Sequence, residues 1–142
     1  MISILFALWL TWCVGNLLLM AVVVPKVPSY TGFRIVMPEY LEQCLTINEY
    51  CAVLAHEQGH RHYHHAWWNY ARVCVFWFPS KLRLAAQEIE ADDYAIGQGC
   101  ALALATALRK LSHAPIDWVR AKRLEEKDWA VYLRTYHQGE VI

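Results

Sequence analysis

Residues 56–60 read H-E-Q-G-H and combine two metal-binding side chains with a base. Residues four apart on a helix share one face, so His56 and His60 can bind one Zn²⁺ through their imidazole nitrogens. Glu57 can reach a water on that metal, where its carboxylate would act as general base. The pattern H-E-x-x-H therefore predicts zinc-dependent hydrolysis. The alternative is a chance match, because five of the seven histidines lie between residues 56 and 65.

A zinc site of this kind needs a third protein ligand besides the two histidines. Carboxylates follow at Glu88, Glu90 and Asp92, in a segment of strong helix formers. Glu88 and Asp92 are four residues apart and share a helix face, whereas Glu90 points nearly the opposite way. We therefore expect Glu88 and Asp92 to face the metal, and Glu90 and Asp93 to be solvated. The alternative for Glu88 is an ordinary surface glutamate.

The helix that carries the two histidines has a recognisable start. Residues 46–49, T-I-N-E, have the form of a capping box, which predicts that the helix begins there. We expect it to run to about Trp67. Three further histidines extend the cluster, and most of them are expected to be solvated surface residues: His62, His64 and His65. The alternative is a second metal site among them.

A short strand is predicted before this helix. Residues 33–37, F-R-I-V-M, alternate loosely and are stopped by a proline, and residues 26–32 before them have the composition of a linker. In a protease such an edge strand can pair with extended substrate, or it can merely pack on the helix. The remaining predicted features are a helix break at Gly97 and Gly99, a helix over residues 101–111 and a final helix over residues 124–136.

The first residues of the chain form a long apolar segment. Residues 2–24 carry no charge and would reach about 35 Å as a helix, enough to cross a bilayer. A cleavable signal peptide would have a basic start and a small-x-small cleavage site, which this segment lacks, and a buried core helix of this length exceeds what a small domain usually hides. We therefore predict a transmembrane anchor over residues 1–25 and one domain over residues 26–142.

Charge and cysteine usage bear on where the domain lies. All thirteen Lys and Arg residues follow the anchor, so the positive-inside rule places the domain in the cytoplasm. Five cysteines at irregular spacing indicate reduced, buried thiols, and the reduced state agrees with that compartment. The net charge is zero, so the chain lacks the basic excess of a nucleic-acid-binding protein.

An aromatic segment, residues 66–79, reads A-W-W-N-Y-A-R-V-C-V-F-W-F-P. It is too short to span a bilayer. Two interpretations remain open. The aromatic side chains could lie on membrane lipid at the interface, or the segment could be a core connection between two helices.

Residues 49–60, E-Y-C-A-V-L-A-H-E-Q-G-H, and residues 88–92, E-I-E-A-D, resemble the zinc motifs of the membrane-anchored gluzincin peptidases, the family of HtpX and the CAAX prenyl protease. The resemblance implies a mainly α, α+β zincin-like fold in which two helices pack around a zinc ion beside a short edge strand or hairpin. It implies that Glu88 is the third ligand and that Asp92 holds a ligating histidine by its other ring nitrogen. Family members often carry a histidine nine residues after the first ligand, where this chain has His65.

The resemblance extends more loosely to the segment after residue 111. Residues 112–115, S-H-A-P, and Arg120 are similar to the family's His-Pro segment and the arginine that follows it. This implies that His113 or Arg120 could stabilise the oxyanion of the reaction. The alternative is a helix cap with a surface ion pair.

These residues together predict a minimal, single-anchor zinc endopeptidase that acts on protein or peptide substrates at the membrane. Glu57 would take a proton from water and pass it to the leaving amine. One alternative is a membrane-bound sensor, which would have to borrow a ligand-binding domain from a partner. The other is a non-catalytic zinc-stabilised module, against which the presence of Glu57 argues, since a structural site needs no base.

Overall fold

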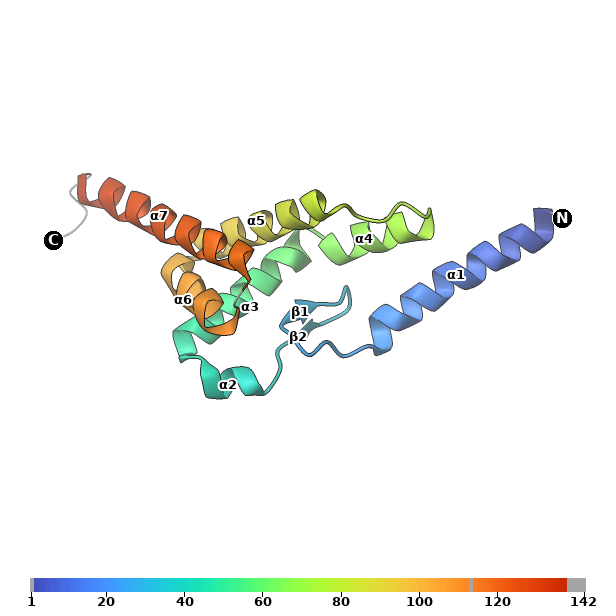
Figure 1. The fold of residues 1–142 in the computed structure, drawn as a ribbon, viewed down its shortest axis with the longest axis horizontal. Coiled ribbons are helices and arrows are strands. Elements are labelled where there is room, and N and C mark those ends of the chain that lie inside the picture. Colours follow the sequence, from blue (N-terminus) through green and yellow to red (C-terminus); the bar gives the residue numbers. More distant parts are fainter. Residues whose placement is uncertain (1, 113, 138–142) are drawn as a thin grey trace.

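Helix α3 (Ile47–His62) carries the H-E-x-x-H pattern and packs against α5, α6, α4 and the small sheet (Figure 1). The computed structural model describes residues 2–112 and 114–137. The other elements, in chain order, are α1 (Ile2–Val22), β1 (Ser29–Tyr30), β2 (Ile35–Val36), α2 (Tyr40–Cys44), α4 (His65–Cys74), α5 (Lys81–Gly97), α6 (Ala101–Leu111) and α7 (Pro115–His137). The predicted mainly α class with a short hairpin is confirmed.

Helix α3 begins where the capping box placed it. The Thr46 hydroxyl accepts from the Glu49 backbone N–H, and the Glu49 carboxylate accepts from the Thr46 N–H at 2.7 Å. The predicted end near Trp67 is wrong, because α3 ends at His62. His64 adopts the left-handed conformation, with φ of 55°, which a right-handed helix cannot continue. Helix α4 starts directly after this turn in a new direction.

Helices α3 and α5 cross at very short range. A Cβ atom placed on Gly59 of α3 would lie 2.9 Å from the Cα atom of Ala91 in α5, and Ala91 is fully buried. Only small residues permit backbones to approach this closely. The crossing brings the middle of α5 beside the histidines of α3.

The apolar core lies where α3 packs on α6, with α2 and α7 closing it. Its largest fully buried apolar side chains are Leu41, Leu104 and Leu124. The break after Gly97 and the α6 helix over residues 101–111 are as predicted, and Gly99 takes a positive φ of 76°. The predicted start of the last helix at residue 124 is wrong, because α7 begins at Pro115, a residue suited to the first helical position.

The predicted strand over residues 33–37 is only partly right. Strand β2 covers Ile35–Val36, and it pairs antiparallel with β1, which lies in the segment expected to be a linker. The register pairs Ser29 with Val36 and Tyr30 with Ile35. Strand β1, not the predicted strand, makes the more extensive contact with α3.

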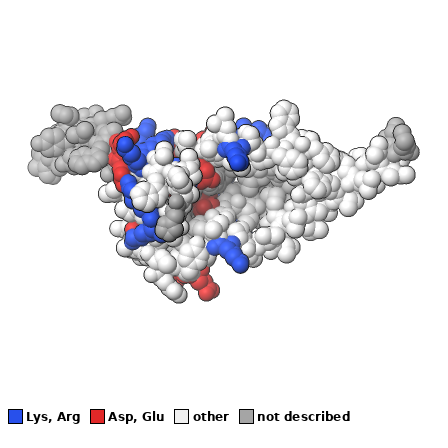
Figure 2. Space-filling view, viewed as in Figure 1, with Lys and Arg blue, Asp and Glu red and all other residues white. Residues whose placement is uncertain are grey.

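Helix α1 extends away from the helical body (Figure 1). Its residues 3–22 are long and apolar enough to cross a membrane. In Figure 2, charged side chains gather over the part formed by the later helices, and the surface along α1 shows none. All five cysteines are free, as predicted from their spacing, but the prediction that they are buried is right only for Cys13 and Cys74, because Cys44 and Cys51 are exposed.

Candidate metal centre

Two helices direct three donor groups at one point. Nε2 of His56 and Nε2 of His60 lie 3.1 Å apart on α3. The Glu88 carboxylate, from α5, lies 3.4 Å from each of them, through Oε2 to His56 and Oε1 to His60. The structure thus brings together the three residues predicted as ligands, in a group that could hold a metal ion.

His56 is held from behind by a fully buried carboxylate. Its Nδ1 lies 2.9 Å from Oδ1 of Asp92, close enough for an ion pair although the ring N–H is not aimed along the hydrogen-bond direction. Burial alone would lower the pKa of His56, but the carboxylates of Asp92 and Glu88 outweigh burial and raise it to about 9. The structure therefore places Asp92 behind the ring nitrogen of His56 that faces away from the donor cluster.

His60 is held by a second histidine, His65. Nδ1 of His60 lies 2.8 Å from Nδ1 of His65, and Nε2 of His65 lies 2.8 Å from Oε2 of Glu90. His65 is 5% exposed, so it is the exception to the prediction that most of these histidines are solvated. Burial lowers the pKa of His65 and favours its neutral form. Glu90 is exposed as expected, but it also contacts His65.

These partners fix the proton positions on both rings. The Glu90 carboxylate can only accept, so His65 donates from Nε2 and its Nδ1 must accept from His60. The same reasoning puts the proton of neutral His56 on Nδ1, toward Asp92. When both rings are neutral, as metal binding requires, each Nε2 atom presents a lone pair to the other and to the Glu88 carboxylate. Without a metal, the raised pKa of His56 makes its ring a cation that donates a proton to these acceptors, and a bound metal ion would take the place of that proton.

Glu57 lies beside this cluster and is buried. It is 5% exposed, and its Oε2 atom is fully enclosed without a hydrogen-bond partner among the described residues. Burial raises the pKa of Glu57, and the positive charges of His56 and His60 only partly offset the rise. A buried carboxylate with a raised pKa and an unused oxygen is suited to receiving a proton.

A cleft of about 270 Å³ gives access to these groups. Its lining combines donors and base with the hairpin, α4 and α5: Ser29, Tyr30, His56, Glu57, His60, His65, Asn69, Gln87 and Glu88. Asn69 and Gln87 hydrogen-bond each other through both amide groups, at 3.0 and 3.1 Å. This pair ties α4 to α5 across the cleft.

Arg120, predicted as a possible oxyanion donor, joins three carboxylates. Its Nε and Nη2 atoms donate to Asp92 at 2.9 and 2.7 Å. Its Nη1 atom donates to Asp117 at 3.0 Å and lies 3.1 Å from Glu88. Burial opposes the charge of Arg120, but these carboxylates outweigh burial and raise its pKa. Burial would also raise the pKa of Glu88, but His56, His60 and Arg120 outweigh burial and lower it. Each guanidinium nitrogen contacts a carboxylate, which favours a positioning role over the oxyanion role.

Other predicted residues do not join the cluster. His113 lies outside the described residues. His62 and His64 are exposed, as predicted. Sequence reasoning missed the His65–Glu90 pair and the Asn69–Gln87 pair. The available signal for His65 was its place nine residues after His56, where members of the similar family often carry a histidine. That spacing does not show the turn after His62 that brings His65 back onto His60.

Comparison of this chain with models of protein families, with curated proteins and with solved structures finds no match. A function therefore has to be inferred from the residues and geometry of the site.

Proposed function

We propose that the chain is a membrane-anchored, zinc-dependent endopeptidase with a zincin-like catalytic site. The observation that carries the proposal is the convergence of His56, His60 and Glu88 beside the buried, unpartnered carboxylate of Glu57. A site that only stabilises a fold closes the metal with four protein ligands, whereas the described residues supply three around an accessible cleft.

The donor set fits zinc. Ligand atoms at 2.0–2.1 Å from a tetrahedral Zn²⁺ are about 3.3 Å from one another. The three separations among His56, His60 and Glu88 are 3.1, 3.4 and 3.4 Å. Two imidazoles with one carboxylate also suit zinc better than magnesium or calcium, which prefer oxygen ligands.

The catalytic roles follow from these positions. When bound, zinc supplies a Lewis acid that lowers the pKa of water and polarises a carbonyl. Glu57 accepts a proton from the attacking water at Oε2 and later releases it to the leaving amine nitrogen. Asp92 and the His65–Glu90 pair orient the two histidines, and Arg120 holds Glu88 and Asp92 in place.

We infer that helix α1 anchors the domain in a membrane, with the domain on the cytoplasmic side. Its length and apolar composition support the anchor, and the distribution of Lys and Arg supports the orientation. The substrate is a protein or peptide whose backbone enters the cleft between β1 and the metal-binding residues. Strand β1 lines that cleft through Ser29 and Tyr30.

The test is cleavage of an unfolded protein such as casein by the full chain in detergent micelles. Wild type should cleave with zinc present and stop when a chelator removes it. Glu57→Gln should keep its zinc and lose about 100-fold or more in rate, because general base catalysis contributes about 10²–10⁴-fold. His62→Ala, which alters an exposed histidine on the same helix, is the control and should retain both. If zinc-loaded wild type cleaves no protein, the chain is a binding module and not an enzyme. If Glu57→Gln keeps full activity, Glu57 is not the general base.

A further inference from the structure

Helix α4 runs alongside α1 and is fastened to its middle. The indole N–H of Trp9 donates to the Cys74 carbonyl at 2.8 Å, and that of Trp12 donates to the Val73 carbonyl at 3.0 Å. In the reverse direction, the Tyr70 hydroxyl donates to the Cys13 carbonyl at 3.1 Å. The aromatic segment is therefore docked on the helix that we assign to the membrane.

These indoles complete the hydrogen bonding at the end of α4. The last carbonyls of a helix have no partner within it and are normally solvated by water. Here the Arg72 carbonyl accepts from Val75 and Trp77 N–H groups, and the Val73 carbonyl accepts from Phe76 N–H. The Cys74 carbonyl is satisfied by Trp9 of α1. The last three carbonyls of α4 therefore have partners within the protein, which lowers the cost of placing this helix end in lipid.

Phe76 occupies a position where glycine is usual. Its φ of 59° and the bonds from Phe76 and Trp77 back to Val73 and Arg72 form a left-handed helix ending of the Schellman type. A phenylalanine there is strained, by about 1–2 kcal/mol for a non-glycine residue. Its ring stacks on Trp12, with centroids 5.7 Å apart and planes 19° apart. The strained residue therefore contributes a second aromatic contact to α1.

The turn after α4 exposes large apolar side chains. Val75, Phe76, Trp77 and Phe78 are 61–73% exposed, so the interpretation of this segment as a buried core connection is wrong. Residues 73–80 contain no charged side chain. In Figure 2, the end of the molecule along α1 shows no Lys, Arg, Asp or Glu side chains. Four adjacent exposed apolar residues would be a liability in water and are expected at a lipid contact.

We propose that α4 and residues 75–79 form a re-entrant element that dips into the hydrocarbon of the bilayer beside α1. The inference rests on the proposed anchoring by α1 and adds a second membrane contact to it. Trp12 lies ten residues before the end of α1 at Val22, or about 15 Å, which is half the thickness of the hydrocarbon core. Arg72, the charged residue of α4, is adjacent to Val73 and so lies near this depth, where its guanidinium has to extend toward the headgroups.

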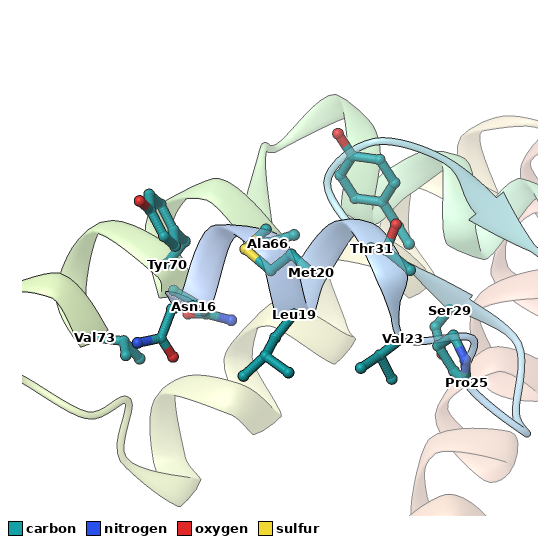
Figure 3. A pocket seen from close by; sticks show the side chains of 12 residues that line it. Asn16, Leu19, Met20, Val23, Pro25, Ser29, Thr31, Ala66, Tyr70 and Val73 are labelled. Carbon is teal, nitrogen blue, oxygen red and sulfur yellow. The ribbon is translucent and has the colours of Figure 1, made fainter. Parts of the chain in front are cut away.

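This placement sets the metal cleft at the membrane surface. An apolar pocket between α1, β1 and α4, shown in Figure 3, has a volume of about 380 Å³ and includes Leu19 and Met20 of α1 and Val23 just after it. It shares Ser29, Tyr30, Ala66 and Asn69 with the metal cleft. The cleft therefore adjoins an apolar space on its membrane side, from which a juxtamembrane segment of a substrate can enter.

The test places an environment-sensitive fluorophore at single cysteines of the full chain in phosphatidylcholine–phosphatidylglycerol vesicles. Cys44, Cys51 and Cys100 are replaced by serine, and the two buried cysteines stay, with this parent chain as the blank. Trp77→Cys tests the turn, and Val75→Cys repeats the test at a second exposed site. Leu8→Cys on α1 is the membrane control, and Ile47→Cys on α3, 78% exposed, is the water control.

Nitroxide carried on lipid chains should quench the label at Trp77→Cys and Val75→Cys as strongly as at Leu8→Cys. Aqueous iodide should quench only Ile47→Cys. Iodide quenching at both turn sites, with lipid quenching kept at Leu8→Cys, would overturn the re-entrant element and leave the anchor intact. Quenching at the turn by neither agent would overturn it in favour of burial against a second protein chain. Iodide quenching at Leu8→Cys would overturn the anchor itself.

Discussion

The Nδ1 atoms of His60 and His65 lie 2.8 Å apart, and Glu90 holds the far nitrogen of His65. This relay leaves Nε2 of His60 as the lone pair that faces the metal position. The contact exists because the chain turns at His64, immediately after α3, and returns along a new helix.

We predict that His65→Phe lowers the affinity for zinc by about 10–100-fold, the usual effect of removing a partner that orients a metal ligand. The ring keeps its volume but loses the acceptor for His60. Competition with a chromophoric chelator measures the change. His62→Phe, at an exposed position of α3, should leave the affinity unaltered. Equal affinities for the two variants would show that the relay does not hold His60.

Gly59→Ala should destabilise the fold and separate α5 from α3. The new methyl group would lie 2.9 Å from the Ala91 Cα atom and 3.0 Å from the Tyr94 Cβ atom, and such overpacking costs about 1–3 kcal/mol. Urea unfolding in micelles measures the loss. Gly97→Ala is the matched control, because nothing lies within 4 Å of its added methyl group, and it should be neutral or stabilising. A Gly59→Ala chain as stable as Gly97→Ala would contradict the close crossing.

The Glu49–Lys110 ion pair should make stability depend on pH. A contact of 2.7 Å with Lys110, together with the Thr46 backbone, lowers the pKa of Glu49 from 4.5 to about 2. Because the folded-state pKa is depressed, the stabilisation is complete above about pH 4.5 and is lost as the pH falls toward 2. Glu49→Gln retains a side chain that can cap α3, so it isolates the charge.

The measurement is the difference in unfolding free energy between wild type and Glu49→Gln across that range. Wild type should be the more stable chain at pH 6, and the difference should shrink steadily below pH 4.5. A difference that stays constant down to about pH 2 would show that the carboxylate charge contributes nothing. The difference in unfolding free energy between wild type and Lys110→Met should shrink over the same pH range.

Phe76 provides a test of the left-handed helix ending on α4. Phe76→Ala removes the stacking on Trp12 and keeps the strain, whereas Phe76→Gly removes both. Glycine should therefore be the more stable of the two variants by about 1–2 kcal/mol. Thermal unfolding in micelles gives the order. An alanine variant at least as stable as the glycine variant would exclude the left-handed conformation at this residue.

Local sequence signals predicted the parts of the fold that depend on neighbouring residues. The capping box at Thr46 and Glu49 and the break at Gly97 are set within one helical turn, and both lie where predicted. The one-turn spacing of His56 and His60 and the shared face of Glu88 and Asp92 are local in the same sense. In each pair, the geometry of a single helix is enough to place both side chains on the same face.

The remaining features depend on contacts between distant residues. The turn at His64 has neither glycine nor proline to signal it, so the sequence predicts too long a helix and does not indicate that His65 is buried against His60. The sequence leaves Arg120 open as an oxyanion donor because its partners, Asp92 and Asp117, are identified only once α7 packs on α5. Bonds from Trp9 to the end of α4 span 65 residues, beyond the reach of any periodic pattern.

The zinc content of the purified full chain, measured by elemental analysis in micelles, tests the central claim most directly. We predict about one zinc ion per chain in wild type and in His62→Ala, because three donors from α3 and α5 form one site. His60→Ala and Glu88→Gln should lose most of that zinc while remaining folded. Zinc content that is unchanged in both of these variants, or absent from wild type grown with zinc, would contradict the account.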